Sequence, residues 1–468
     1  MGQHIETYRK MIEKDPVFSE VSRQMASSCG SSFPEQMTCF LLAPVAVSFA
    51  AWVLREAVSR KIDRVYFLAR DGWQFYQAAR ALQKSWKLPV ELRYLYCSRY
   101  SLRIPCYCLM GEEALGYICL RGMEVSFADM MARAGLDEGE AAAIAEKIGY
   151  REDIRKPIPL TQIPKFRERL SQCPLFLEKM QNVSREAYRN AMDYFDREGL
   201  LEEGSFAIAD SGWTGTTQQV LEQLLASGGR KRPLDGFYFG LYDLPAGVDP
   251  LRYHTFYFSP AGNLRRKAEF SNSLFEAVFS APHGMTVGYR EGGTGPVLTA
   301  ERGLQADEME RQTEWIERYA ECYGQKRPAP GQDGGERNGS GQGSPGESAA
   351  DTSEKDAGFI AGLLRLFMSQ PDRSEAEVYG NYRFSDDVTE KRTHPLALPM
   401  TEDELLSGHI LKKFRRLYLK KDLPVRESAW YEGSARLYSS RASWHQRHYR
   451  RYKELIYLRK GLERKLRK

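Results

Sequence analysis

The spacing of hydrophobic residues changes twice near the start of the chain. Residues 1–60 place apolar side chains about every 3.6 positions, which predicts helices. The run 64–70, RVYFLAR, is rich in β-forming residues and is followed by Asp-Gly at 71–72, so it predicts a buried strand that stops at a turn. Helical spacing returns over 73–82, and a second apolar run follows over 92–97. A strand, a loop, a helix and a strand in this order indicate a parallel sheet.

A second unit of the same kind lies further along the chain. Residues 206–209 predict a strand, 210–216 a loop, 217–225 a helix and 235–242 the next strand. The segment between the two units is rich in Ala, Glu and Arg at helical spacing, and we interpret it as a helical insertion. The sequence therefore predicts an α/β fold, with a parallel twisted sheet, a helical insertion and helical N- and C-terminal flanks.

One segment has the composition of a linker. Residues 324–357 hold 8 Gly among 34 positions and no Val, Ile, Leu, Met or aromatic residue. Such a segment cannot bury enough surface to fold, so we expect it to be disordered. The predicted organisation is an N-terminal helical segment at 1–60, an α/β domain at 61–300 with its insertion at about 105–200, a helix at 301–323, the linker at 324–357, and a basic helical region at 358–468.

The longest apolar run covers residues 39–54 and contains Pro44. It falls short of the roughly 20 residues that span a bilayer, so we expect a buried helix, with a membrane-dipping segment as the alternative. The eight cysteines are too sparse for a disulfide scaffold, and the CxC pair of Cys106 and Cys108 has no second pair to complete a zinc site. We find no secretory leader and expect a cytoplasmic protein with reduced thiols.

Charge is distributed unevenly, although the net charge is only +5. Residues 409–468 hold 19 Lys and Arg against 5 Asp and Glu, while the rest of the chain holds 48 against 57. Apolar residues such as Leu455, Leu458 and Leu462 lie between the cations of this tail. We favour a basic amphipathic helix on the anionic inner face of a membrane, which would make the protein peripheral there. The alternatives are a plain solvated or partner-binding helix and a nucleic-acid arm, which the acidic body argues against.

The loop predicted after residue 209 is the most informative motif. Residues 210–217 read DSGWTGTT, a carboxylate at a strand end followed by glycines, hydroxyls and a helix. Backbone N–H groups at the positive end of a helix suit a phosphate monoester, and Asp210 can accept hydrogen bonds from sugar hydroxyls. The carboxyl edge of a parallel sheet is also where such folds bind ligands. The alternative is a Gly/Thr turn that only caps the helix.

The earlier turn supplies candidate cations. Arg70 is a fixed cation beside a predicted helix N-terminus, with Asp71 and Gly72 next to it, and this suits a diphosphate. Arg99, after the next predicted strand, is a second candidate. The alternatives are a local ion pair between Arg70 and Asp71, and a surface role for Arg99.

The run FAIADSGWTGTTQQVLEQL, at 206–224, resembles the phosphoribosyl-diphosphate (PRPP) signature of type I phosphoribosyltransferases. In that signature, apolar strand residues lead into an acidic pair and a loop ending in Thr-Gly-Thr-Thr. Ser211 stands here at the second acidic position, and Gly212 with Trp213 where aliphatic residues are usual. The resemblance implies that Asp210 holds the ribose hydroxyls and that the 5-phosphate is held by Thr214, Gly215, Thr216 and Thr217.

A further resemblance covers more of the chain. FLARDGW, at 67–73, resembles the diphosphate loop of the same enzymes. With YLYCSRYSLRIP, ADSGWTGT and FEAVFSAPHGMTVGY it also resembles a bacterial family from polysaccharide-biosynthesis loci, commonly labelled HAD-superfamily hydrolase-like, over roughly residues 40–290. This implies a type I phosphoribosyltransferase-like glycosyltransferase module in surface-glycan assembly. It also implies Mg²⁺ held through the diphosphate of PRPP, with no protein metal site, and a separate phosphatase that removes the 5-phosphate.

A base for an acceptor hydroxyl is also needed. Glu269 and Glu276 lie two helical turns apart in the sequence, so we place them on one face of a helix, and either is a candidate base. The basic residues 265–267 precede them and suit a diphosphate or an acidic glycan, and His283 lies in a loop that the family resemblance marks. The alternatives are an ordinary amphipathic helix, a solvated basic cluster and a structural histidine.

We therefore expect transfer of a ribosyl 5-phosphate, or a related activated sugar, from PRPP to a hydroxyl of a glycan or lipid-linked acceptor. The expected catalytic residues are Asp210, Arg70, Asp71 and Glu276, and the expected substrate-binding residues are Gly72, Arg99, Ser211, Gly212, Thr214, Gly215, Thr216 and Thr217.

Two other functions stay open. A non-catalytic sugar-phosphate-binding scaffold is favoured by Ser211 in place of the second acid. A HAD-like phosphohydrolase would use Asp71, but Asp71 is followed by Gly72 and Trp73 and not by the Asp-x-Asp pattern of such enzymes.

Overall fold

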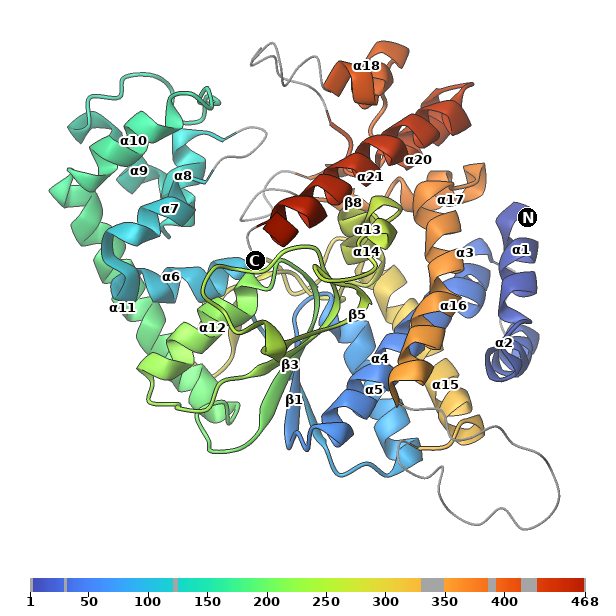
Figure 1. Ribbon diagram of the computed structural model, residues 1–468. Coiled ribbons are helices and arrows are strands. Elements are labelled where there is room, and N and C mark those ends of the chain that lie inside the picture. The colour runs from blue at the N-terminus through green and yellow to red at the C-terminus, as the bar shows by residue number, and fades with distance from the viewer. Residues whose placement is uncertain are drawn as a thin grey trace.

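The computed structural model describes residues 3–28, 32–120, 125–329, 349–385, 393–413 and 427–466. At its centre lies a five-stranded sheet in which every pair of strands is parallel, in the order β2-β1-β3-β4-β5 (Figure 1). The α/β class and the parallel sheet predicted from the sequence are confirmed. The strands are β1 (Arg64–Leu68), β2 (Glu91–Leu95), β3 (Phe206–Trp213), β4 (Asp235–Leu241) and β5 (Tyr253–Phe258).

Alternate residues of the strands point to opposite faces of the sheet, and both faces are covered. Val65 and Phe67 of β1 belong to one buried cluster, whereas Tyr66 and Leu68 belong to another. A strand that is buried on both faces needs apolar residues at every position, which is why β1 reads as a continuous apolar run. The sheet is therefore the middle layer of three.

Helices from distant parts of the chain cover the first face. The apolar helical stretch Phe33–Ser59 is long and apolar enough to span a membrane by length and composition alone, but its most apolar part is entirely buried inside the protein. The prediction of a buried helix is confirmed, because its C-terminal part packs against α5 and α15. The helices on this side are α3 (Phe33–Met37), η1 (Thr38–Leu42), α4 (Ala43–Ser59), α5 (Gly72–Trp86), α14 (Asn272–Val278), α15 (Ala306–Lys326) and α16 (Ala349–Ser369), with α1 (Gln3–Ile12) and α2 (Pro16–Ser28) outside them.

The second face is covered by α6 (Arg99–Met110), α11 (Pro174–Arg197) and α12 (Thr216–Ser227). The helices between β2 and β3 in the chain also form a buried cluster of their own, and they stand beside the sheet at the left of Figure 1. They are α6 (Arg99–Met110), η2 (Gly111–Ala114), α7 (Leu115–Ile118), α8 (Phe127–Arg133), α9 (Glu138–Lys147), α10 (Ile163–Ser171) and α11 (Pro174–Arg197).

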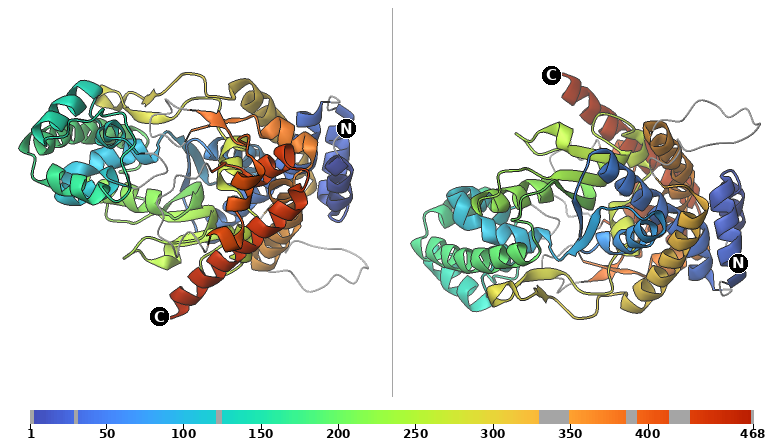
Figure 2. Two further views of the ribbon diagram at one scale, coloured as in Figure 1. Left: turned by 90° about the horizontal axis from the view of Figure 1, so that it is seen from above. Right: turned by 90° about the horizontal axis from the view of Figure 1, so that it is seen from below.

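The C-terminal part of the chain closes over one end of the sheet. The long helix α21 (Ala442–Leu466) packs on α13 (Arg265–Ala268) and α20 (Tyr431–Tyr438), and its C-terminal end extends past the body of the protein in Figure 2. The remaining elements are η3 (Pro250–Arg252), α13 (Arg265–Ala268), β6 (Thr286–Tyr289), η4 (Glu291–Gly293), β7 (Pro296–Leu298), α17 (Arg373–Tyr379), β8 (Arg383–Phe384), β9 (His394–Pro395), α18 (Glu402–Ser407) and α20 (Tyr431–Tyr438).

Three sequence predictions need correction. The expected disordered segment 324–357 is too wide, because α15 continues to Lys326 and α16 begins at Ala349, while residues 330–348 lie outside the described part of the chain. The edge strand β5 was not predicted. The segment 210–216, predicted as a loop, is strand as far as residue 213 and leaves only residues 214 and 215 between β3 and α12, as the next section describes.

Candidate active site

The two motif loops flank the point where the strand order reverses. From β1 the chain proceeds to β2 on one side of the sheet, and from β3 it proceeds to β4 on the other side. The segments that follow β1 and β3 therefore diverge, and in open parallel sheets ligands bind in the crevice left at such a switch point. Arg70 and Asp71 follow β1, and Thr214 and Gly215 follow β3. The candidate residues chosen from the sequence thus lie where the topology favours a site.

The segment after β1 is joined directly to β3. The hydroxyl of Ser211 donates a hydrogen bond to Oδ2 of Asp71, so the two motifs are in contact. Gly72 begins α5, and a Cβ at this position would lie 3.2 Å from the backbone carbonyl carbon of Phe67. A larger residue directly after Asp71 would therefore need the backbone at Phe67 to shift by a few tenths of an ångström. The peptide bond between Ala69 and Arg70 is cis.

The prediction of a loop over 210–216 is wrong for its first four residues, because β3 continues to Trp213. Gly212 pairs with Gly240 of β4, and a Cβ on Gly212 would lie 2.5 Å from the Gly240 carbonyl oxygen. Two facing glycines let the strands approach closely enough to stay paired beyond Asp210. Only Thr214 and Gly215 separate the end of β3 from the first residue of α12.

The extension of β3 separates the two residues expected to act together. Neighbouring residues of a strand point to opposite faces, so Asp210 and Ser211 lie on different sides of the sheet. Ser211 contacts Asp71 on the α5 side. Asp210 faces the opposite side, where its charge raises the pKa of the buried thiol of Cys97, in addition to the larger effect of burial.

Three carboxyl groups at this edge have raised pKa values. Burial, and then the nearby charge of Asp71, raise the pKa of Asp210 to about 8, although Arg99 opposes the shift. Burial and Asp71 also raise the pKa of Glu276 to about 7. Burial raises the pKa of Asp71 itself, against the Ser211 hydrogen bond and the charges of Arg70 and Arg99. The edge therefore holds acids that take up protons near neutral pH, which is frequent at functional sites.

Glu276 joins the site from α14 through Trp213. The indole Nε1 of Trp213 donates to Oε1 of Glu276 at 2.5 Å. The expectation that Glu269 and Glu276 share a helical face is wrong, because Glu269 follows α13 and α14 begins only at Asn272. Glu269 instead lies 3.5 Å from Arg450 of α21. Of the two candidate bases, only Glu276 is placed with the other acids.

Two arginines of α6 lie beside the N-terminus of α12. Arg99 and Arg103 are one helical turn apart and line a shallow pocket with Thr216 and Thr217. Within the described residues, neither arginine has a carboxylate within ion-pair distance, and burial lowers the pKa of Arg103. Arg103 was not among the residues predicted from the sequence, where only its spacing of four from Arg99 pointed to it. Two cations, two hydroxyls and a helix N-terminus therefore lie close together, but the depression between them is closed in this structure, so an anion can reach them only if these side chains move apart.

Gly215 shapes the start of α12. It has a positive φ of 66°, and a Cβ there would lie 2.6 Å from the ring of Tyr253. Thr214 and Thr216 lie on either side of it, with their hydroxyl oxygens 3.4 Å apart. Both hydroxyls and the free N–H groups of the first turn of α12 therefore lie at the same edge.

Both ring nitrogens of His283 have hydrogen-bonding partners that hold the ring in place. Its Nδ1 lies 2.8 Å from the carbonyl oxygen of Gly284, and its Nε2 lies 2.8 Å from the hydroxyl of Tyr94. If Nδ1–H donates to the carbonyl, Nε2 accepts from Tyr94, and burial lowers the pKa of the imidazole, which favours this neutral form. Trp73 packs edge-on against Tyr94 and His283 and belongs to the same aromatic group.

The basic cluster at 265–267 divides between two environments. Arg266 pairs with Glu354 at 2.9 Å. Lys267 is buried, with its ammonium nitrogen 5.5 Å from the ring centroid of Phe270 and 5.7 Å from those of Tyr242 and Tyr457. Burial lowers its pKa to about 7. The cluster is therefore not one solvated cationic patch.

A metal-ligand grouping is found away from the predicted residues. His4, Asp372 and Glu375 place one ligand atom each within 4.8 Å of one another. Asp372 and Glu375 already form the capping box at the start of α17, and Glu375 accepts hydrogen bonds from Tyr8 and His4. These contacts explain the grouping as a set of hydrogen bonds that holds α1 against α17. Within the described residues, Asp71, Asp210 and Glu276 do not form a grouping this tight.

Comparison with models of known protein families and with curated proteins finds no match for this chain.

Proposed function

We propose that the protein transfers a ribosyl 5-phosphate group, or a closely related activated sugar, from PRPP to a hydroxyl of a glycan or lipid-linked acceptor. The observation that carries this proposal is the meeting of three raised-pKa carboxyl groups with arginines and a helix N-terminus at the β1/β3 switch point. A sugar bearing phosphates at two positions needs such an arrangement of separate anion and hydroxyl contacts.

The donor would use both sides of the crevice. Its 5-phosphate would be bound by Thr216, Thr217 and Arg99, which line one pocket. Its diphosphate would be bound near Arg70, next to the start of α5. Asp210 would accept hydrogen bonds from the ribose hydroxyls, as in the family that the sequence resembles. The 5-phosphate contact supplies binding energy remote from the reacting carbon.

Mg²⁺ fits this site as a partner of the diphosphate. The ion would be held through the diphosphate oxygens, and the nearby carboxylates of Asp71 and Asp210 would favour its positive charge without forming a ligand group of their own. When bound, the ion would neutralise charge on the departing diphosphate. Asp71 and Asp210, which carry raised pKa values in the free protein, would give up protons as this positive charge enters.

The chemical step needs a proton acceptor. The bond from C1 of the sugar to the diphosphate oxygen breaks, and a bond from C1 to the acceptor oxygen forms. The acceptor hydroxyl gives its proton to Glu276, whose pKa of about 7 suits a base at neutral pH. Trp213 holds this carboxylate through Oε1. The carboxylates at this edge stabilise positive charge that develops at C1.

One observation favours a second candidate, a sugar-phosphate-binding scaffold without catalysis. Ser211, at the position of the second acid, is buried and donates its hydroxyl to Asp71, so it cannot contact the ribose as a carboxylate would. In a phosphohydrolase, by contrast, Asp71 would need an acid two residues later, where Trp73 stands.

Calorimetric titration with PRPP tests the proposal. We expect micromolar binding that requires Mg²⁺ and is weakened by Thr216→Ala, while Thr161→Ala, on an exposed site of the helical insertion, binds as the wild type does. Ribose 5-phosphate should bind more weakly, because it lacks the diphosphate. Binding measured in buffers of different ionisation enthalpy should show proton release near pH 7.

The outcomes separate the candidates. Donor binding together with acceptor-dependent release of diphosphate supports the transferase. Donor binding without turnover supports the scaffold, and phosphate release that only Asp71→Asn abolishes supports the hydrolase. Absence of binding by PRPP and ribose 5-phosphate, or full transfer by Asp210→Asn, would contradict the proposed site.

A further inference from the structure

Helix α21 is held against the body of the protein along one face. The ring of Tyr449 lies 4.2 Å from that of Tyr431, and Lys453 pairs with the buried Glu432 at 2.7 Å. Near the C-terminal end, Arg464 pairs with Asp243 at 2.7 Å. Contacts at both ends of the helix fix its rotation, so the opposite face is presented outward.

The outward face carries a stripe of arginines and leucines, which we call the outward stripe. It consists of Arg447, Arg451, Leu455, Leu458 and Leu462, whose spacings of four, four, three and four place them on one side of the helix. The three leucines are 44%, 45% and 62% exposed. Leu455 and Leu458 leave nearly half of their surface exposed and Leu462 leaves more than half, so all three present apolar surface outward.

The charge of the stripe indicates what it contacts. Within the described residues, Arg447 and Arg451 have no carboxylate within ion-pair distance, whereas the adjacent Arg459 pairs with Glu463 at 2.6 Å. Cations at one end of the stripe and leucines at the other suit a surface with anionic headgroups over an apolar interior. A nucleic acid would engage the arginines but would leave the leucines in water.

The position of α21 relates this face to the candidate site. Arg464 donates to the carbonyl oxygens of Tyr242 and Pro260, which follow β4 and β5. The C-terminal half of α21 therefore lies at the carboxyl edge of the sheet, the edge that also carries Asp71 and Asp210. In Figure 1 this helix crosses one end of the sheet, and the helical insertion stands on the other side of that edge.

We propose that the outward stripe docks the protein on an anionic membrane surface, with the leucines in the headgroup region and Arg447 and Arg451 against anionic lipids. The bound protein would hold the carboxyl edge of its sheet close to the bilayer. That this places the site beside a lipid-linked acceptor rests on the proposed function, but the docking itself does not.

Flotation of the full-length protein with lipid vesicles tests the docking without donor or acceptor. We expect binding to phosphatidylcholine vesicles that contain about a third phosphatidylglycerol, little binding to phosphatidylcholine alone, and weaker binding at high salt. The triple variant Leu455→Ser, Leu458→Ser, Leu462→Ser should partition at least about tenfold less. The double variant Arg447→Glu, Arg451→Glu should lose the preference for anionic lipid.

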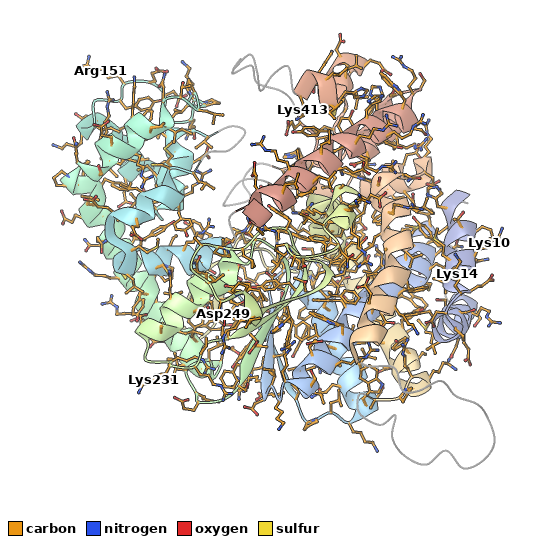
Figure 3. All side chains as sticks on the ribbon, in the orientation of Figure 1. Lys10, Lys14, Arg151, Lys231, Asp249 and Lys413 are labelled. Atoms are coloured by element: carbon orange, nitrogen blue, oxygen red, sulfur yellow. The ribbon has the colours of Figure 1, made fainter. Side chains whose placement is uncertain are left out.

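Matched controls are available elsewhere on the surface. Leu109, Leu160 and Leu251 are also exposed, and their triple substitution by Ser should leave vesicle binding unchanged. Arg151, labelled on the helical insertion in Figure 3, is likewise exposed, and Arg151→Glu should have no effect. Because the stripe leucines and the control leucines are all partly exposed, both triple variants should stay folded, and thermal unfolding of the two variants should show similar losses of melting temperature.

The proposal is overturned if the wild type does not bind anionic vesicles, or if the control triple variant loses as much binding as the stripe variant. It is also overturned if the leucine substitutions leave vesicle binding intact and instead convert a dimer to a monomer, which would assign the stripe to a second copy of the chain. Vesicle binding without any transferase activity would contradict the proposed function and leave the docking supported.

Discussion

Charged residues at the two edges of the parallel sheet are partnered in opposite ways. At the amino edge, Arg64 pairs with Glu91 at 2.5 Å and with Glu202 at 3.0 Å. At the carboxyl edge, Arg99 and Arg103 have no carboxylate within ion-pair distance among the described residues, although three acids lie close enough to feel the charge of Arg99. Both are edges of one sheet, so the difference lies in the charged side chains that the surrounding segments bring to each edge.

The pKa values follow this difference. Glu91 is partly buried, which would raise its pKa, but hydrogen bonds from Arg93 and Arg64 hold the pKa below its ordinary value. Asp210 is desolvated beside another acid, and its pKa rises to about 8. The amino edge uses its charges to stabilise the fold, whereas the carboxyl edge keeps charges that cost stability until a ligand satisfies them. This contrast is expected between structural and functional groups.

The largest expected effect is on turnover. Asp210→Asn should lower transfer from PRPP by about 100-fold or more, because it removes a carboxylate from the charge-stabilising edge. Asp235→Asn, at the amino edge of β4, should change turnover by less than about twofold. Initial rates of diphosphate release with acceptor present measure both. Equal losses in the two variants would mean that the edges do not differ in function.

Binding of the 5-phosphate gives the next largest effect. Replacing Arg99 or Arg103 by Gln should weaken PRPP binding by about 10- to 100-fold, since each removes a charged hydrogen bond to phosphate. Arg64→Gln should leave affinity unchanged and instead lower the free energy of unfolding by on the order of 1 to 3 kcal/mol, because it leaves Glu91 with one partner fewer. Calorimetry and thermal unfolding of the same three variants check this, and a destabilised Arg103→Gln with normal affinity would refute it.

Much of this contrast could be predicted from the sequence. The runs RVYFLAR and FAIAD, each followed by a turn-forming or hydroxyl-rich segment, predicted strands that end in functional groups, and the structure places both strands side by side. Arg70, Asp71 and Asp210 were found in this way because strand ends of a parallel sheet meet at one edge. The order of the strands was not predictable, since it depends on pairings between residues more than a hundred positions apart.

The parts that sequence reasoning missed depend on tertiary contacts. The extension of β3 to Trp213 rests on Gly212 facing Gly240, and nothing local to either residue reveals the other. Glu269 and Glu276 were placed on one helix because their spacing fits, but the chain turns between α13 and α14. Arg103 was missed because nothing in the sequence places residues 99–104 beside the segment after β3, and only the packing of α6 on α12 brings Arg103 next to Thr216 and Thr217.

The stability contribution of an acid should depend on pH in opposite directions at the two edges of the sheet. The raised pKa of Asp210 means that the folded state keeps a proton that the unfolded chain releases between about pH 4 and pH 8, so its contribution to stability falls as the pH rises through this window. Asp210→Asn should therefore gain on the order of 2 kcal/mol at pH 8.5 and less at pH 5.

Asp235 provides the matched comparison. It is partly buried, but its bonds to His254 and Arg252 lower its pKa, so its contribution to stability is present above pH 4 and is lost as the pH falls. Asp235→Asn should lose about 1 kcal/mol at neutral pH. Thermal unfolding of both variants at pH 5 and pH 8.5 measures the effect, and a loss of stability by Asp210→Asn at pH 8.5 would contradict it.

The smallest expected effect concerns the hydrogen bond from Ser211 to Asp71, which joins the two motifs. The Ser211 hydroxyl opposes the burial that raises the pKa of Asp71, so Ser211→Ala should raise this pKa further. If Asp71 works as a carboxylate beside the diphosphate, the acid limb of the kcat/KM profile should move to higher pH by up to about one unit, with little change at the plateau. Ser227→Ala, at the far end of α12, is the matched control and should leave the profile in place. If the acid limb stays in place and the basic limb moves to higher pH instead, Asp71 acts in its protonated form, and the role proposed for its carboxylate is contradicted.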